Sequence, residues 1–289
     1  MTTIVSDRPR SMRTNELRPV ALITGASSGI GAALARRFAG EGHALALVSL
    51  PDPKLAALAE EIAASTGKQP LTLEVDLTYR DAGVRIAAAL AGAGFETQFI
   101  VNCAGFGLVG PAAVLDCGEQ LAMVDVNVRA LADLCLRFSD SLIRRRGGIL
   151  NVASLSAFLP APEMAVYNAS KKFVLSFSEA LHQELGPHGV RVTVLCSGPV
   201  PTRFQTRAGI RANLPRLLAC SPQFVARAAY DGLMAGKRVV VPGVGNKGLR
   251  LMLRVIPPGV LLPGSQAAMR FSMRPPRKRA VPAFRRGPA

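Results

Sequence analysis

The chain has 289 residues, 49% of them hydrophobic, which is enough to bury a sizeable core. Its five cysteines include no closely spaced pair, which argues against a disulfide framework, and its three histidines have no metal-ligand spacing. No secretory signal and no uncharged apolar run of about 18 residues is visible. We therefore expect a soluble protein of a reducing compartment, the cytoplasm, without a metal site.

The net charge of +16 is concentrated at the C-terminal end, where residues 247–289 contain ten Lys and Arg and no acidic residue. Residues 1–18 are polar and lack periodicity, so we expect a disordered leader, and the Pro/Arg-rich stretch beyond about 275 should be disordered as well. Phe271 and Phe284 are the aromatic residues among these charges. Since the charge lies outside the fold with few aromatics, we expect no nucleic-acid partner.

A glycine-rich turn follows the first apolar run of the chain. Residues 20–23 have the character of a strand, and Ile30, Leu34 and Phe38 then recur at helical spacing. A strand, a tight turn and a helix in this order direct backbone N–H groups and the helix dipole towards a phosphate. The pattern therefore predicts a phosphate-binding turn, with a turn that binds no ligand as the alternative.

The small residues of this turn have separate expected tasks. Gly25 permits the tight turn, Gly29 allows close approach to a pyrophosphate, and Gly31 lets the helix pack against the strand. Ser27 and Ser28 add hydroxyl donors. The spacing T-G-x-x-x-G-x-G differs from the usual dinucleotide fingerprint, so the turn alone is a weak signal.

Strands and helices alternate along the rest of the chain. Further strands are predicted at 44–48, 71–75, 98–101, 148–152, 190–195 and 238–241. Helices are predicted at 54–66, 81–91, 119–146, 167–185 and 224–234. The buried face expected for the helix at 167–185 consists of Phe173, Val174, Phe177 and Leu181. This alternation predicts an α/β fold, a Rossmann-like doubly wound parallel sheet in a single domain over 19–245, with a lid at 199–221.

Residues 246–289 form a basic C-terminal extension to this domain. A short helix is expected here, ended by Pro257, with apolar and basic faces. The residues assigned to the apolar face are Leu249, Met252, Leu253 and Ile256, with Arg250 and Arg254 opposite. We expect this face to pack on the body or on a partner subunit, and the alternative is a peripheral anchor on an anionic membrane surface.

Tyr167 and Lys171 lie one turn apart on a predicted helix. A tyrosine of pKa about 10 becomes an effective acid–base group at neutral pH when a nearby cation stabilises the phenolate. Ser154 follows the fifth predicted strand, and Asn127 lies inside a predicted helix, where Asn is a poor helix former. Alone, the Tyr–Lys pair could be an exposed surface pair and Asn127 a solvent-facing residue.

Taken together, these motifs resemble the short-chain dehydrogenase/reductase family over about residues 19–241. The motifs in common, in family order, are Thr24-Gly25-xxx-Gly29-x-Gly31, Asn102-Cys103-Ala104-Gly105, Asn127, Ser154, Tyr167-xxx-Lys171 and Ser197-Gly198-Pro199. The runs at 165–181 and 237–243 are most similar to the ketoacyl- and steroid-reductase-like branch. Family members often carry Asn where Cys103 stands and Pro where Ser197 stands, and both departures are to small residues.

The resemblance implies a role for each of four residues. Tyr167 would exchange a proton with the substrate oxygen, and Lys171 would lower the Tyr167 pKa and bind the nicotinamide ribose. Ser154 would orient and polarise the carbonyl. Asn127 would fix a water that links Lys171 to solvent.

The resemblance also implies a nicotinamide dinucleotide cofactor and the residues that bind it. These residues are Gly25, Ser27, Ser28, Gly29, Ile30, Gly31, Asp76, Leu77, Asn102, Ala104, Gly105, Tyr167, Lys171, Pro199, Val200 and Thr202.

The choice between NAD and NADP depends on the end of the second strand. An NAD-selective site places a carboxylate there, about 20 residues past the glycine motif, but that position falls near Ser49, and Asp52 lies beyond a proline. The arginine that NADP-preferring relatives often carry is also missing, with Leu50 in its place. Because Ser49 or Lys54 could contact a 2′-phosphate, we expect NADP to be favoured over NAD.

The sequence thus predicts an NAD(P)-dependent oxidoreductase that interconverts a carbonyl and a secondary alcohol on a largely apolar small-molecule substrate. The alternative is a nucleotide-binding sensor or scaffold with the same fold and no catalysis. The helices at 119–146 and 167–185 resemble those of the family's dimer interface, so we expect a homodimer or homotetramer. The expected location is cytoplasmic, with peripheral membrane contact through the extension as an option.

Overall fold

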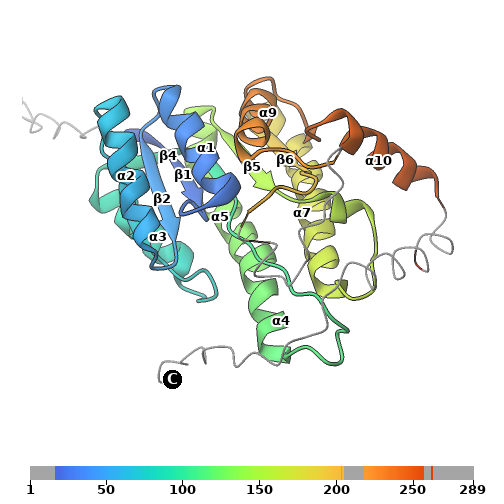
Figure 1. Cartoon of the computed structure of the whole chain (residues 1–289). Helices are drawn as coiled ribbons and strands as arrows, with labels where there is room; N and C mark the ends of the chain where they lie inside the picture. Colours follow the sequence, from blue (N-terminus) through green and yellow to red (C-terminus); the bar gives the residue numbers. More distant parts are fainter. Residues whose placement is uncertain (1–16, 203, 205–217, 257–261, 263–289) are drawn as a thin grey trace, which may run out of the picture.

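The computed structural model of the chain describes residues 17–202, 204, 218–256 and 262. Within these residues the centre of the fold is one sheet of seven parallel strands in the order β3-β2-β1-β4-β5-β6-β7 (Figure 1). The strands are β1 (Arg18–Thr24), β2 (Leu45–Ser49), β3 (Leu71–Glu74), β4 (Phe95–Asn102), β5 (Gly148–Val152), β6 (Arg191–Leu195) and β7 (Val239–Val240). The predicted Rossmann-like, doubly wound parallel sheet is confirmed.

Helices cover both faces of this sheet (Figure 1). One face packs against α1 (Gly29–Gly40), α2 (Pro53–Thr66) and α9 (Pro222–Met234). The other face packs against α3 (Ala82–Gly92), α5 (Leu131–Arg137), α6 (Ser139–Arg145) and α7 (Ala165–Leu185). The remaining elements are α4 (Cys117–Val124), η1 (Asp125–Ala130), η2 (Leu155–Phe158), η3 (Gly186–His188) and α10 (Val244–Val255).

The core lies on both sides of the sheet because successive strand residues point to opposite faces. In β1, Val20 and Leu22 enter the core under α3, α5 and α7, whereas Ala21 and Ile23 enter the core under α1, α2 and α9. All four side chains are at least 98% buried. This double burial explains why the strands have continuous apolar sequences rather than alternating ones.

The long helix predicted at 119–146 is divided into four segments. Between α4 and α5, the segment η1 is a π-helix, which has a wider turn than an α-helix. A second interruption falls at Phe138, between the end of α5 and the start of α6. Apolar periodicity alone does not detect such interruptions, because the buried side chains continue on both sides of them.

Helix α7 buries part of the face that its sequence predicts. Val174 and Leu181 are buried, as expected. Phe173, also expected in the core, is 38% exposed and stacks on Phe177 with the ring centroids 5.4 Å apart. The prediction for Phe173 was therefore wrong, whereas its stacking partner Phe177 is partly buried and packs against the core.

The C-terminal helix α10 projects on the side of the molecule opposite α2 and α3 (Figure 1). Its Arg250 guanidinium lies 5.1 Å from the centroid of the Phe158 ring in η2, so Arg250 faces the body instead of the solvent face expected for it. The leader at 1–16, most of the lid at 199–221 and the extension beyond 256, apart from Leu262, lie outside the described residues. Among the described helices, none has the length and apolar character that crossing a membrane requires.

Candidate active site

The site is built where the strand order reverses, at the carboxyl ends of β1 and β4. The Thr24 hydroxyl at the end of β1 accepts hydrogen bonds from the backbone N–H groups of Cys103 and Ala104, each at 3.1 Å. These two residues follow β4 directly. One buried hydroxyl therefore fixes the two loops that border the crevice.

The glycines of the first turn bring backbone close to backbone. Gly25 has φ +66°, and a Cβ at this position would lie 2.8 Å from Cα of Ala104. A Cβ on Gly31 would lie 2.1 Å from the carbonyl oxygen of Gly25, and one on Gly29 would lie 3.0 Å from the side chain of Thr202. A side chain at any of these positions would fill the space above the turn. The predicted tasks of the three glycines fit this geometry, and the cradle suits a dinucleotide pyrophosphate.

A pocket of about 1920 Å³ opens above this turn. Ligand pockets of single small molecules measure about 300–1,000 Å³, so this one has room for a dinucleotide and a substrate. The residues predicted to bind cofactor that line it are Gly25, Ser27, Ser28, Gly29, Ile30, Gly31, Asp76, Leu77, Ala104, Gly105, Tyr167, Lys171, Pro199, Val200 and Thr202. Ser154 lines it as well. The structure thus gathers residues from both halves of the chain around one cavity.

Tyr167, Ser154 and Lys171 form a group at the base of the pocket. The hydroxyls of Tyr167 and Ser154 lie close enough for Ser154 to lower the Tyr167 pKa, and Ser154 caps η2 by accepting a hydrogen bond from the Ser156 N–H at 3.1 Å. The Lys171 ammonium donates to the Val152 carbonyl at 3.0 Å and lies 5.9 Å from the centroid of the Tyr167 ring. Both Tyr167 and Lys171 are 6% exposed. The pair is therefore not the exposed surface pair that chance spacing would give.

Burial sets the proton affinities of these two groups. Burial raises the pKa of Tyr167 to about 12, against the opposing effect of the Ser154 hydroxyl. Burial lowers the pKa of Lys171 to about 8. The expected lowering of the Tyr167 pKa by Lys171 is not found in this structure, because desolvation of the phenol dominates and the ammonium is directed at Val152. At neutral pH Tyr167 is a neutral phenol, which can donate a proton.

Asn127 lies in the π-helix η1 and is 1% exposed, so the solvent-facing alternative was wrong. Its amide Nδ2 donates to the carbonyl of Phe106 and to Oγ of Ser170, both at 3.0 Å, and its Oδ1 accepts from the Phe106 N–H at 3.2 Å. A Cβ on Gly105 would lie 2.9 Å from this Oδ1 and 3.4 Å from Nζ of Lys171. Asn127 thus lies behind the pocket wall, beside Lys171.

Asn102 is the predicted cofactor-binding residue that does not line the pocket. Its Nδ2 donates to Oδ1 of Asn151 at 2.9 Å, and Nδ2 of Asn151 donates to Oγ of Ser178 at 2.9 Å. This buried network joins β4, β5 and α7 beneath the pocket floor. The side chain of Asn102 therefore supports the site from below.

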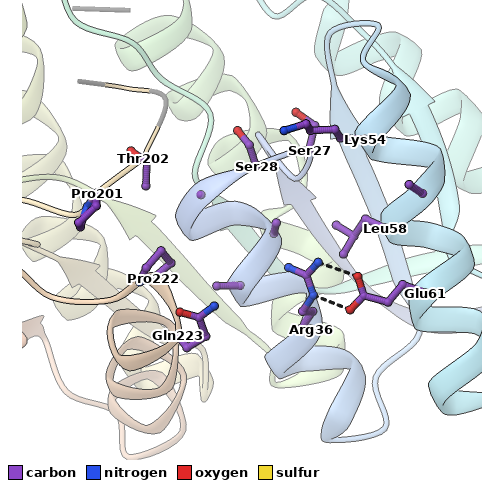
Figure 2. A pocket seen from close by; sticks show the side chains of 14 residues that line it. Ser27, Ser28, Arg36, Lys54, Leu58, Glu61, Pro201, Thr202, Pro222 and Gln223 are labelled. Carbon is purple, nitrogen blue, oxygen red and sulfur yellow. Dashed lines mark hydrogen bonds and ion pairs between the residues drawn. The ribbon is translucent and has the colours of Figure 1, made fainter. Parts of the chain in front are cut away.

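A smaller pocket of about 450 Å³ lies between α1, α2 and the start of α9 (Figure 2). Ser27, Ser28 and Lys54 line one part of it, and Arg36 and Glu61 form a bidentate ion pair in another part (Figure 2). The guanidinium is therefore neutralised, whereas Lys54 is exposed and its ammonium has no ion pair among the described residues. The ammonium can reach an anion beside the glycine turn.

Several residues of the larger pocket were not expected to form the site. Phe106, Leu108, Met164, Phe204, Leu218, Leu249 and Leu253 line it and are mostly apolar. Leu249 and Leu253 belong to the helix face that was expected to pack on the body or on a partner subunit, and they pack on the body. Met252 was assigned to the same face but is 48% exposed, so that assignment was wrong. The contribution of Leu249 and Leu253 makes α10 a wall of the pocket.

A family model described as short chain dehydrogenase matches residues 19–212 of the chain. The chain belongs to this family, and it is an oxidoreductase of the class that uses NAD(P). A short chain dehydrogenase of Pseudocercospora fijiensis is 35% identical over 189 residues, which cover 64% of this chain and 60% of that protein. The similarity thus spans less than two thirds of that relative's length.

Solved structures share the fold over most of the chain. A short-chain dehydrogenase from Sphingobium yanoikuyae in complex with NADPH is 29% identical, with a TM-score of 0.74 over 93% of this chain and 100% of that one. A 3-ketoacyl-(acyl-carrier-protein) reductase from Brucella melitensis complexed with NADH is 28% identical, with a TM-score of 0.66 over 80% of this chain and 98% of that one. Both cofactor types therefore occur on this fold.

The lowered pKa of Lys171 predicts a pH-dependent stability cost. The pKa of the Lys171 ammonium is about 10.5 in the unfolded chain and about 8 in the folded chain. Burying the charged ammonium therefore lowers the free energy of unfolding by its full amount below pH 8, and this cost disappears as the pH rises to 10.5. Replacement by Met should therefore stabilise the protein most below pH 8, by an amount of the order of 3 kcal/mol. Urea unfolding of wild type and Lys171→Met without added cofactor, from about pH 7 to pH 10, measures this difference.

The matched control is Lys54→Met, because Lys54 is exposed. Its difference from wild type should stay flat over the same pH range. A Lys171→Met difference that is equally flat would contradict the assigned burial effect.

Proposed function

We propose that the enzyme interconverts a carbonyl group and a secondary alcohol on a largely apolar substrate. The observation that carries this proposal is the placement of the Tyr167 and Ser154 hydroxyls together on the wall of an apolar pocket next to the glycine turn. Two neighbouring hydroxyls in one pocket can both bind a single carbonyl oxygen. A pocket built for nucleotide sensing alone would need no such pair.

In the direction of reduction, Ser154 donates a hydrogen bond to the carbonyl oxygen and polarises it as negative charge develops. Tyr167 transfers its phenolic proton to that oxygen, so the C=O double bond becomes a C–O bond with a new O–H. A nicotinamide dinucleotide held at the glycine turn would supply the hydride that the carbonyl carbon needs. In the direction of oxidation the same groups work in reverse.

Lys171 and Asn127 help Tyr167 to lose its proton and to regain one. The Lys171 ammonium lies on the same helix as Tyr167 and would stabilise the phenolate once it forms. Asn127 lies beside Lys171 and holds the Phe106 backbone at the pocket wall. We assign to it the positioning of the water that returns a proton to Lys171.

The pocket favours an apolar substrate. Tyr167 packs in a cluster with Met123 and Met164, and its ring centroid lies 5.5 Å from that of Phe204. Leu155 and Leu159 add further apolar surface from the segment around η2. A bulky ketone or an acyl-chain carbonyl gains hydrophobic contact here, whereas a sugar would leave its hydroxyls without partners.

Tyr167→Phe should reduce turnover of a ketone to below a few per cent of the wild-type rate, because it removes the proton that the product oxygen needs. Cofactor binding should be almost unchanged, since the glycine turn and adenine contacts lie elsewhere in the pocket. A panel of bulky ketones, followed by the loss of NADPH absorbance, measures the rate, and NADPH fluorescence titration measures binding.

Lys171→Ala supplies the comparison, because it should lower both turnover and cofactor affinity. A Tyr167→Phe enzyme that retains more than a few per cent of the rate would show that this assignment is wrong. A wild type that turns over no carbonyl or alcohol would favour the nucleotide-binding sensor or scaffold.

We further propose NADP as the preferred cofactor. Ser49, at the position of the NAD-selective carboxylate, is 7% exposed and its hydroxyl donates to the Leu50 carbonyl at 2.6 Å. No carboxylate therefore stands at the end of β2 itself, while Lys54 brings positive charge to the same pocket as Ser27 and Ser28. A 2′-phosphate bound there would find one cation and two hydroxyl donors.

Lys54→Ala should lower kcat/KM for NADPH by about tenfold, the loss of one charge-assisted hydrogen bond, and leave kcat/KM for NADH within about twofold. Steady-state kinetics with each cofactor measure both values. Lys68→Ala is the matched control, since Lys68 is exposed and donates to the Gly42 carbonyl away from the pocket. A wild-type preference for NADH of about tenfold, about 1.4 kcal/mol, would exclude the NADP assignment.

We also propose that the enzyme is a cytoplasmic homodimer or homotetramer. Leu121 on α4, Leu136 on α5 and Phe173 on α7 are 60%, 59% and 38% exposed, an apolar surface that a second copy would cover. All five cysteines are free, as a reducing compartment would leave them.

Light scattering at micromolar concentration should therefore give two or four times the chain mass of 30.4 kDa. Phe173→Glu should lower that mass, because it places charge within the apolar surface, whereas the exposed Val84→Glu on α3 should not. A wild-type mass of one chain would rule out the assembly.

A further inference from the structure

Helix α10 has two faces of different character, and its inner face is fixed to the body. Asn246 is fully buried, and its Nδ2 donates to the carbonyls of Pro242 at 2.8 Å and Leu218 at 3.2 Å. Its Oδ1 packs so closely on Gly198 that a Cβ there would lie 2.4 Å away. The cation–π contact of Arg250 with Phe158 secures the next turn. These contacts determine which side of the helix faces outwards.

The outer face of α10 is apolar. Val244 is 85%, Leu251 66% and Met252 48% exposed. Successive residues of an α-helix are rotated by about 100°, so Val244 and Leu251 lie on the side opposite Asn246 and Leu253, and Met252 lies at the edge of this face. No other part of the described chain covers them. Leaving such a group of apolar side chains in water is unfavourable and marks an interaction surface.

The helix and the sequence that follows it carry positive charge. Lys247 is exposed on the same helix, and residues 247–289 carry ten Lys and Arg without one acidic residue. A second copy of this chain would bring the same positive charge to the contact. Nucleic acid would pair with the charge but leave Leu251 and Met252 in water. An anionic lipid surface matches both features, because its headgroups attract cations and its acyl boundary accepts apolar side chains.

We propose that the outer face of α10 binds the surface of an anionic lipid bilayer. Val244, Leu251 and Met252 enter the boundary between headgroups and acyl chains, and Lys247 contacts the headgroups. The helix axis lies parallel to the bilayer surface, with the apolar face towards the lipid and the opposite face held against the body of the protein. Because Leu249 and Leu253 of the same helix line the pocket, the docked enzyme holds one wall of that pocket next to the bilayer.

Vesicle sedimentation of the full-length protein tests this proposal. The vesicles contain phosphatidylcholine alone, or phosphatidylcholine with about 30% phosphatidylglycerol, at low salt and at about 0.5 M salt. Wild type should bind the anionic vesicles and keep a measurable bound fraction at high salt, because the apolar contact is not screened. The double variant Leu251→Ser with Met252→Ser should bind at least about tenfold more weakly.

Val84→Ser is the matched control, since Val84 is 52% exposed and belongs to α3, which lies on the side of the molecule opposite α10 (Figure 1). It should bind the vesicles as wild type does, and all variants should keep the wild-type melting temperature because the replaced side chains are exposed.

Three outcomes would overturn the proposal: no binding to anionic vesicles, binding that high salt abolishes and the double variant leaves unchanged, or a lower mass of the double variant in light scattering. The second would assign binding to the charge of the chain alone, and the third would assign the face to a second copy.

Discussion

The hydroxyl of Thr24 joins the carboxyl ends of two neighbouring parallel strands, and the geometry of the site depends on this contact. It accepts hydrogen bonds from the backbone N–H groups of Cys103 and Ala104, so the loop after β4 lies directly against the glycine turn after β1. Gly25 then has no room for a side chain. Because the two loops are fixed relative to each other, the backbone itself forms the cradle that suits a dinucleotide pyrophosphate.

Most of the fold could be predicted from the sequence, because strand and helix lengths follow from the apolar pattern and the alternation of the two dictates a parallel sheet. The failures at Phe173 and Arg250 have one physical origin. The pattern of apolar and polar residues divides a helix into two faces, but it does not show what each face contacts in the folded protein. Phe173 was therefore assigned to the core although it is exposed, and Arg250 was assigned to solvent although an aromatic ring attracts it inwards.

The residues of the site could be predicted as a set, since their motifs occur together, but their electrostatics could not. The spacing of Tyr167 and Lys171 indicates proximity, and from proximity one expects the cation to lower the phenol pKa. In the folded protein both groups are buried, and desolvation raises the pKa of Tyr167 and lowers the pKa of Lys171. Sequence also cannot show that Asn102 turns into a buried network, because its neighbour Asn151 is 49 residues away.

The π-helix at η1 makes the length of this helix as important as its composition. A π-turn holds one residue more than an α-turn, so every side chain after it is rotated by about 100° relative to an uninterrupted helix. Deleting a single residue between Asp125 and Ala130 would restore a regular helix and leave Leu131 and Leu134 facing the core, while removing the wide turn that contains Asn127. The extra residue of this turn thus serves Asn127 and the site, and the core packing of α5 does not depend on it.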